Sequence, residues 1–262
     1  MDRHARISSL LAMLAQNGKV EVEEAVAALG ASPATIRRDL VYLDEQRLAT
    51  RTHGGAVASS GSFDLPLRFK TGQAVREKQR IGSMAADLVP FGSVIALNGG
   101  TTTLEIGRAL AARADFASST DDVPALTIVT NAVNLAGEML VRPHFKVVVT
   151  GGVVRAHSYE LFGPLANQSI RALSVDTTFL GVDGFDASFG ASAHSDAEAS
   201  ANSLLADCAS RVVVVADGSK VGRRAFAQIC TPDKVDILIT DEGANAQAVE
   251  RIRSLGIEVL GV

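Results

Sequence analysis

Residues suited to holding an anion follow five apolar, β-rich runs of this 262-residue chain. The five groups are Asn98-Gly99-Gly100-Thr101-Thr102-Thr103, Thr130-Asn131, Thr150-Gly151-Gly152, Gly181-Val182-Asp183-Gly184 and Asp217-Gly218-Ser219-Lys220. Gly99 and Gly100 let the backbone approach a phosphate closely. The amides of the following helix and the hydroxyls of Thr101, Thr102 and Thr103 can donate to that phosphate. The pattern therefore predicts a site for an anionic ligand.

Charged side chains can complete this site. Lys220 and Arg155 can add positive charge, while Asp183 and Glu198 can accept hydrogen bonds from sugar hydroxyls or an amino group. Each motif taken singly has a plainer interpretation, as a tight turn, a solvated loop or a surface side chain. The prediction therefore depends on the five strand ends acting together.

Other ligand chemistries are not indicated by these spacings. The paired glycines lack the Lys-Ser/Thr ending of a nucleotide P-loop and the complete glycine pattern of a dinucleotide site. Cys208 and Cys230 lie outside any metal-ligand spacing, and so few cysteines indicate a reducing cytosol. We therefore expect no metal, no cofactor and no catalytic residue.

A second group of residues is suited to binding DNA. Ser32 can accept from the free amides of a helical first turn, and Pro33 is favoured at the first helical position. In that helix Ile36, Leu40 and Leu43 fall on one apolar stripe, which would face a core. The helix therefore has a buried side and a free outer side.

Two arginines occupy that outer side. Arg38 points away from the apolar stripe and Arg37 lies at its edge. Residues 7–29 carry the spacing of two earlier helices, and three short helices with a tight turn before the third are typical of a helix-turn-helix, whose third helix enters the major groove. Residues 48–57 predict a hairpin whose tip, Thr52 to Gly55, forms a wing for phosphate or the minor groove.

The alternative is a three-helix bundle with solvated arginines. Seven basic and seven acidic residues cancel in the first 56 positions, so only their placement favours DNA. A net charge of −4 and a pI near 5.8 also exclude a generally basic surface. We expect the DNA contacts to come from Ser32, Pro33, Thr35, Arg37, Arg38, Arg51, His53 and Gly54.

From about Gln73 the chain alternates between helices and strands. A charged helix at 74–88 is followed by β-rich runs at 93–97, 126–129, 145–149, 178–182, 212–216, 237–239 and 257–260. Helical patterns separate several of these runs, which predicts a largely parallel sheet covered on both faces. In such sheets the ligand crevice lies beyond the carboxyl ends of the strands, so the five polar groups can converge there.

We expect an α/β protein of two domains. A winged helix-turn-helix occupies residues 1–57, a linker of small polar residues begins the span 58–72, and an α/β domain covers 73–262. The apolar run near the N-terminus is too short for a secretion signal, and none approaches the length of a membrane span. We therefore expect a cytoplasmic protein with no membrane partner.

The run from Ser32 to Leu40, then Leu43, and the run from Arg51 to Ala56 resemble the signature of the DeoR family of bacterial sugar-metabolism repressors. The resemblance implies a sensor domain similar in fold to ribose-5-phosphate isomerase and glucosamine-6-phosphate deaminase, with a phosphate held by the loop from Gly99 to Thr103. Asp183, Glu198 and Lys220 match positions that are catalytic or ligand-facing in those isomerases. The run from Ser158 to Pro164, with His194 and Asn202, is similar to regulators of amino-sugar use, whereas Asn98 stands where aspartate is usual.

We therefore expect a repressor that leaves operator double-stranded DNA when a phosphorylated sugar binds. The effector contacts expected are Asn98, Gly99, Gly100, Thr101, Thr102, Thr103, Thr130, Asn131, Gly151, Gly152, Arg155, Asp183, Glu198 and Lys220. A homodimer or homotetramer is implied because one short recognition helix gives too little contact for specific binding. Two alternatives stay open: an isomerase or deaminase with a DNA-binding appendage, in which Asp183 or Glu198 acts as base, and an activator instead of a repressor.

Overall fold

The computed structural model describes residues 1–46, 48–58, 66–118 and 123–262. The chain divides into two compact units, Met1–Gln73 and Ala74–Val262. Of the span expected to be a linker, residues 59–65 lie outside the described residues. Residues 67–70 form a short helix, and the side chain of Phe69 packs into the core of the first unit. The end of the expected linker is therefore part of the first unit.

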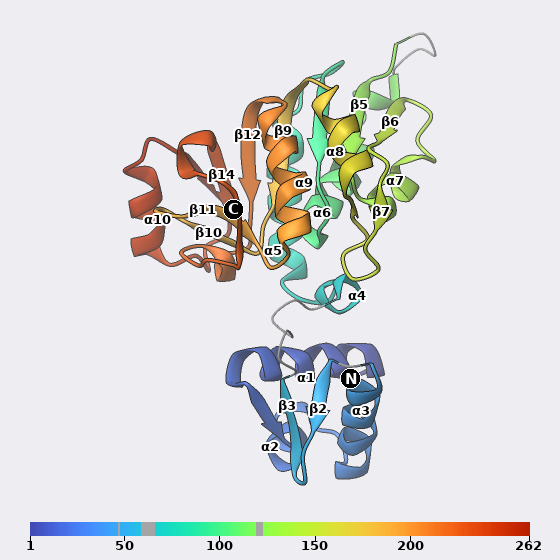
Figure 1. The fold of residues 1–262 in the computed structure, drawn as a ribbon, viewed down its shortest axis with the longest axis vertical. Coiled ribbons are helices and arrows are strands. Elements are labelled where there is room, and N and C mark those ends of the chain that lie inside the picture. Colours follow the sequence, from blue (N-terminus) through green and yellow to red (C-terminus); the bar gives the residue numbers. More distant parts are fainter. Residues whose placement is uncertain (47, 59–65, 119–122) are drawn as a thin grey trace. The chain divides into compact units, whose positions relative to one another are not determined.

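The first unit is a winged helix-turn-helix (Figure 1). Its helices are α1 (Arg3–Asn17), α2 (Val22–Leu29), α3 (Pro33–Glu45) and α4 (Leu67–Lys70), and its strands are β1 (Lys19–Glu21), β2 (Ala49–Arg51) and β3 (Gly55–Ala58). Gly18 and Gly30 end the first two helices in the left-handed conformation, as expected of glycine at this position. The short strand β1 was not predicted. It pairs with β3, giving the antiparallel order β1-β3-β2.

Helix α3 begins as its sequence predicts. Pro33 takes the first helical position, and the Ser32 hydroxyl accepts from the Thr35 amide at 3.2 Å. Ile36, Leu40 and Leu43 are fully buried in a core shared with α1. Asp39 is also buried, and its carboxylate accepts from Nε of Arg6 at 2.5 Å. This pair fixes α3 against α1, because an unpaired buried carboxylate would be costly.

The second unit is built around a seven-stranded sheet whose neighbouring strands all pair in parallel. The strands are β4 (Val94–Leu97), β5 (Leu126–Thr130), β6 (Phe145–Val149), β9 (Val175–Gly181), β12 (Ala209–Val215), β14 (Ile237–Thr240) and β15 (Glu258–Gly261). Their order is β15-β14-β12-β9-β4-β5-β6. The predicted parallel sheet is confirmed.

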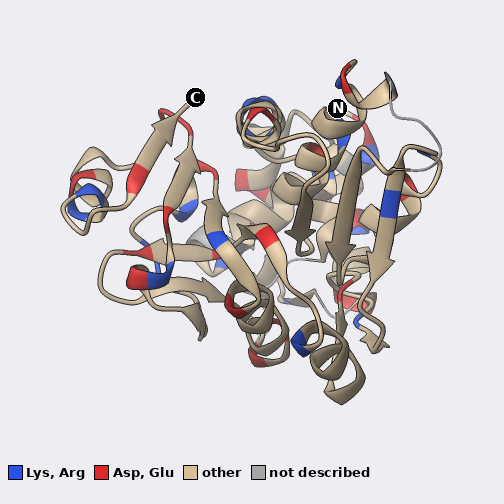
Figure 2. Ribbon diagram, turned by 90° about the horizontal axis from the view of Figure 1, so that it is seen from above, with Lys and Arg blue, Asp and Glu red and all other residues tan. Residues whose placement is uncertain are grey.

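Helices cover both faces of this sheet (Figure 2). Helices α5 (Val75–Asp87), α6 (Thr101–Ala111) and α7 (Val133–Met139) pack on one face, and α8 (Pro164–Arg171), α9 (Asp196–Asp207) and α10 (Ala246–Arg253) on the other. Val213 and Val215 join the first layer, and Val212 and Val214 join the second. Burial on both sides explains the unbroken apolar run of β12.

Smaller elements, none of them predicted, complete the second unit. Strands β10 (Gly184–Asp186), β11 (Gly190–Ala193) and β13 (Ala227–Cys230) form an antiparallel sheet, and β7 (Val153–Val154) pairs with β8 (Leu161–Phe162). Single 3-10 turns occur at Phe116–Ser118, Gly218–Lys220 and Pro232–Lys234. Strands this short carry too little alternation to be recognised from sequence.

The strand order has a reversal point that matters for ligand binding. From β4 the chain moves outward through β5 to β6, then returns to β9 on the other side of β4 and continues to β12, β14 and β15. The loops that follow β4 and β9 therefore leave the sheet in opposite directions. In open parallel sheets the ligand crevice forms at this position.

Candidate functional site

The five polar strand ends are neighbours in space. The strands that lead into them, β12, β9, β4, β5 and β6, are consecutive in the sheet and parallel. Their carboxyl ends therefore meet at one edge, with the groups at 98–103 and 181–184 on the two sides of the reversal point. The sheet topology brings together groups that are far apart in sequence.

Asn98 bridges the reversal point. Its Oδ1 accepts from the amide of Gly181 at 2.8 Å, and its Nδ2 donates to the Gly181 carbonyl oxygen at 2.9 Å. The side chain is buried. Asn98 therefore holds the two loops at a fixed separation, and an aspartate here could not donate the second hydrogen bond.

The loop before α6 presents free backbone donors. Gly100 lies at φ +136°, a conformation that glycine permits, and it precedes the first turn of α6. The amides of Gly100, Thr101 and Thr102 have no acceptor among the described residues. The Thr103 hydroxyl instead donates to the Gly100 carbonyl oxygen at 3.1 Å. The loop thus offers amides and the helix dipole to an anion, while Thr103 shapes the loop.

Glu160 reaches this loop from the segment between β7 and β8. Its Oε1 accepts from the Gly99 amide at 2.7 Å, and the Nδ2 atoms of Asn131 and Asn202 each lie 3.5 Å away. Burial, followed by the nearby charge of Glu198, raises the pKa of Glu160 to about 8. The sequence interpretation had not placed Glu160 among the site residues. The sequence signal was the run from Ser158 to Pro164, which contains Glu160 and resembles amino-sugar regulators.

Two predicted site residues form an ion pair close to Glu160. Nη1 of Arg155 donates to Oε1 of Glu198 at 2.6 Å. Glu198 lies in the first turn of α9, where the Ser195 hydroxyl caps the helix by accepting from the Glu198 amide. Because Glu198 is buried and Arg155 is partly exposed, the guanidinium is the more accessible partner.

Asp183 and Lys220 lie beyond β9 and β12. The Asp183 carboxylate accepts from the His194 amide at 3.1 Å, and Nζ of Lys220 donates to the Val182 carbonyl oxygen at 2.8 Å. These contacts hold the aspartate and the lysine at the same pair of strand ends. A carboxylate acceptor and a cation are thus available next to the reversal point.

The remaining predicted residues mainly shape the site. The Thr130 hydroxyl accepts from the Ala132 amide at 3.0 Å, and Nδ2 of Asn131 donates to Oδ1 of Asn202 at 3.2 Å. Oδ1 of Asn131 is buried and has no partner among the described residues. Gly151 and Gly152 both have positive φ, and a Cβ at Gly152 would lie 2.6 Å from the Phe162 carbonyl oxygen. Asn202 was named only through the resemblance to amino-sugar regulators and was not among the predicted site residues.

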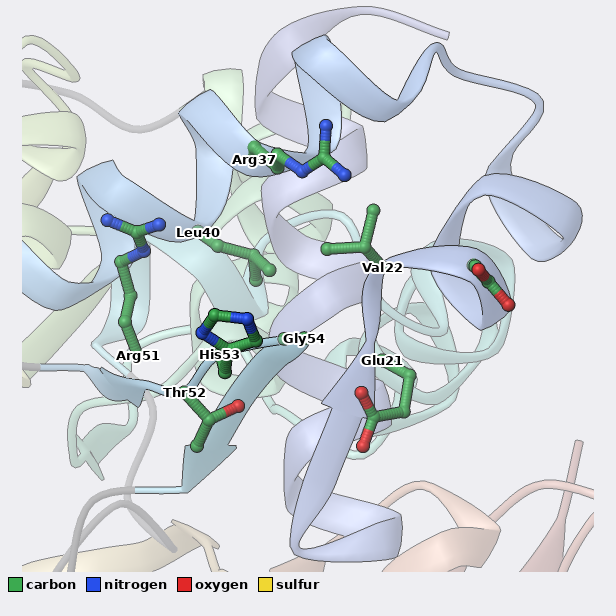
Figure 3. A pocket seen from close by; sticks show the side chains of 10 residues that line it. Glu21, Val22, Arg37, Leu40, Arg51, Thr52, His53 and Gly54 are labelled. Atoms are coloured by element: carbon green, nitrogen blue, oxygen red, sulfur yellow. The ribbon is translucent and has the colours of Figure 1, made fainter.

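Four of the eight predicted DNA-contact residues line one hollow of the first unit, and the other four, Ser32, Pro33, Thr35 and Arg38, lie at the start of α3 or within it. Arg37 and Arg51 border a hollow of ≈ 330 Å³, together with His53 and Gly54 at the tip of the wing (Figure 3). Arg38 is exposed, and its Nη2 approaches the Thr35 hydroxyl at 3.5 Å. Basic groups from α3 and from the wing therefore border one hollow.

Two carboxylates that the sequence interpretation did not include border the same hollow. Glu21 ends β1 and Glu23 lies in the first turn of α2. In Figure 3 Glu21 lies across the hollow from Arg51. A phosphate in this hollow would be attracted toward Arg37 and Arg51 and repelled by the acidic wall.

The sequence matches the DeoR C terminal sensor domain over residues 73–242 and the DeoR-like helix-turn-helix domain over residues 6–61. This chain belongs to the DeoR family. Among similar proteins, a "Putative aga operon transcriptional repressor" of Escherichia coli O157:H7 is 32% identical over 97% of this chain and 92% of that protein. The "Glycerol-3-phosphate regulon repressor" of Escherichia coli K12 is 30% identical over 92% of each chain. This DeoR-family chain is a DNA-binding transcriptional regulator.

Solved structures similar to this DeoR-family protein include two of distant sequence. Ribose 5-phosphate isomerase A of Methanocaldococcus jannaschii matches 56% of this chain and 55% of its own, with 17% identity and a TM-score of 0.41. The sorbitol operon regulator SorC of Klebsiella pneumoniae matches 96% of this chain and 99% of its own, with 13% identity and a TM-score of 0.43. Among the described residues no group of histidine, cysteine, aspartate or glutamate could hold a metal ion, and no helix could cross a membrane.

Proposed function

We propose that this regulator represses a carbohydrate-catabolism operon and is released from its operator by a phosphorylated sugar. The observation that carries the proposal is the loop before α6, whose free amides lie at the reversal point of a parallel sheet. The names of its relatives, repressors of the aga operon and of the glycerol-3-phosphate regulon, support this assignment.

The phosphate would bind at the first turn of α6. The amides of Gly100, Thr101 and Thr102 would donate to it, aided by the positive end of the helix dipole. Lys220 lies at the end of β12 and would supply the opposing charge. A phosphate ester is favoured over a carboxylate because it has more oxygens that can accept hydrogen bonds from these donors.

The sugar would extend from the phosphate toward the polar groups near β9 and α9. Asp183 and Glu198 provide acceptors for hydroxyl or amino groups, and the unpaired Oδ1 of Asn131 provides a third. Arg155 would contact the ligand from the segment before β8. These groups suit a ligand rich in hydrogen-bond donors.

Operator DNA would be bound by the first unit. Helix α3 would enter the major groove with Arg37 and Arg38, while Arg51, His53 and Gly54 of the wing would contact the backbone. A dimer or tetramer would place two such units on two half-sites, and the effector would favour a subunit arrangement that no longer matches their spacing.

The test of the effector site uses two variants, Lys220→Ala and Thr102→Val. Both are expected to lower affinity for the inducing sugar phosphate about tenfold or more, because Lys220→Ala removes the opposing charge and Thr102→Val removes a hydroxyl that can donate to the phosphate in addition to the loop amides. Lys146→Ala and Thr127→Val are matched controls, since both residues lie in the amino-terminal halves of strands of the same sheet. A thermal-shift screen identifies the sugar phosphate, and a reporter assay measures induction. Normal induction in both site variants would contradict the proposal.

Enzymatic turnover is the second candidate function. It is favoured by three carboxyl groups near the reversal point, those of Glu160, Asp183 and Glu198. We propose instead that the chain is not an enzyme, since Glu198 is paired with Arg155, and Asp183 holds the His194 amide. Purified protein is expected to leave ribose 5-phosphate and amino-sugar 6-phosphates unchanged. Turnover that is lost in Asp183→Asn would establish the enzyme instead.

A further inference from the structure

The contact between Glu160 and Gly99 joins two parts of the second unit. The carboxyl of Glu160 accepts the Gly99 amide at 2.7 Å across 61 residues of sequence. The packing is so close that a Cβ at Gly99 would lie 2.3 Å from Cγ of Glu160. The amides that follow, from Gly100 to Thr102, have no acceptor among the described residues. An acidic side chain of the protein therefore already occupies one end of the anion loop.

The surroundings of Glu160 disfavour its negative charge. Glu160 is 3% exposed. Glu198 of α9 and Asp183 beyond β9 are both close enough to raise its pKa, and the guanidinium of Arg155, in the same segment, is paired with Glu198. A dianionic phosphate on the same loop would add further repulsion, because buried like charges interact strongly.

The segment that carries Glu160 includes strained backbone and is hydrogen-bonded both within itself and to the end of β5. Tyr159 has φ +62°, which is unfavourable for a residue with a side chain. The Arg155 amide donates to the Glu160 carbonyl oxygen, and the Leu161 amide donates to the Asn131 carbonyl oxygen. Movement of Glu160 would therefore disturb both the Arg155 ion pair with Glu198 and the end of β5.

We propose that Glu160 is an internal competitor for the anion loop, which an effector phosphate must displace from the Gly99 amide, moving the segment 155–160 with it. This inference rests on the proposed phosphate site before α6. Glu160 then sets the effector concentration that is needed for release from DNA. The segment 155–160 moves when the effector binds.

The experiment measures the dissociation constant of inorganic phosphate by calorimetry, on the full chain, at pH 6.5 and pH 9. Glu160→Gln keeps the shape of the side chain but cannot ionise. At pH 9 this variant is expected to bind phosphate about tenfold more tightly than the natural protein, and at pH 6.5 about equally. Comparing the proteins at one pH removes the effect of the titration of phosphate itself. Glu258→Gln, which removes an exposed charge from the edge strand β15, is the matched control and should bind like the natural protein.

Hydrogen exchange of the natural protein gives a second, independent readout. The amides of Arg155, Tyr159 and Leu161 are hydrogen-bonded, and they should exchange faster when phosphate is present. Equal affinity of Glu160→Gln and the natural protein at pH 9, or weaker binding by the variant, would overturn the competition. Unchanged or slower exchange at these amides would overturn the movement. If neither protein binds phosphate or any phosphorylated sugar, the proposed function fails together with this inference, whereas phosphate binding by the variant alone supports both.

Discussion

At the scale of single residues, the first unit has an arginine paired with a buried carboxylate and others that are exposed on α3. Arg6 is committed to the buried carboxylate of Asp39, whereas Arg37 and Arg38 on α3 are exposed. Neighbouring residues of one helix, Arg38 and Asp39, thus differ in burial, the first exposed and the second buried. Removing the exposed guanidinium groups should affect DNA without affecting folding.

Arg38→Ala, and less strongly Arg37→Ala, are expected to weaken operator binding. Loss of a bidentate contact to a base costs about 1–3 kcal/mol, whereas loss of a phosphate contact lowers affinity for all sequences and reduces the salt dependence. Fluorescence anisotropy with operator and random DNA at several salt concentrations separates the two cases. Arg251→Ala, in α10 of the second unit, is the control. Unchanged operator affinity in both α3 variants would exclude this placement of the recognition helix.

Glu160 should also make the stability of the second unit depend on pH. The ordinary pKa of 4.5 is raised to about 8 in the folded protein, chiefly by burial. The folded state therefore holds a proton that the unfolded chain releases between these values. This contribution is fully present below pH 4.5 and is lost as pH rises through 8, by about 1.4 kcal/mol per pH unit within that window.

Glu160→Gln is expected to remove this dependence. Urea unfolding of the natural protein and of the variant, followed by circular dichroism from pH 5 to pH 9, should give free energies that diverge as pH rises, with the variant more stable at pH 9. Parallel curves for the two proteins would show that the carboxyl is ionised in the folded state throughout.

At the scale of elements, the wing depends on a close approach between two strands. β3 pairs with β1 at Gly55, where a Cβ would lie 1.9 Å from the Val20 carbonyl oxygen. At the adjacent Gly54, a Cβ would lie near only the flexible end of the Glu21 side chain. Two neighbouring glycines therefore differ in what they permit.

Gly55→Ala is expected to destabilise the first unit by about 1–3 kcal/mol, since β1 and β3 must separate to admit the methyl group. Gly54→Ala is the matched control and should leave the unfolding transition within about 0.5 kcal/mol of the natural protein. Thermal unfolding, together with operator binding, measures both effects. Equal stability of the two variants would contradict the described register of the wing.

At the scale of the whole molecule, the two units have separate hydrophobic cores. One core cluster joins α1, α3, the wing and Phe69, and the others lie on the two faces of the parallel sheet. Units with their own cores can fold independently. We therefore expect that cutting the chain between the two units separates effector binding from DNA binding.

A fragment from Ala74 to Val262 is expected to fold alone, to bind the effector and to self-associate, but not to bind operator DNA. Light scattering measures its mass, thermal shift with the sugar phosphate measures ligand binding, and anisotropy measures DNA binding. A ligand at about one hundred times its dissociation constant should stabilise the fragment by about 2.7 kcal/mol. An aggregated fragment would contradict the division of the chain. A monomeric fragment would indicate that the oligomer contacts lie in the first unit.

Local sequence was sufficient for features that short-range chemistry decides. Ser32 and Pro33 predicted the start of α3. A serine hydroxyl is favoured as the N-cap, and proline, which lacks an amide hydrogen, is favoured at the first helical position. The apolar runs of β4, β5, β9 and β12 indicated buried parallel strands, and the polar residues that follow them indicated the edge where a ligand would bind. The two-domain organisation was predicted from the change near Gln73, where alternating helices and strands begin.

Tertiary structure alone decided which strand ends are adjacent and what their side chains contact. Residues 83 positions apart, Asn98 and Gly181, meet because β9 returns beside β4, and no local periodicity encodes that order. Glu160 and Gly99 meet because the segment before β8 returns to the end of β5, where the Leu161 amide donates to the Asn131 carbonyl oxygen, so a carboxyl that resembles any surface glutamate in sequence is buried against the anion loop. Strand order and burial depend on how helices pack on both faces of the sheet, and that packing is a property of the assembled fold.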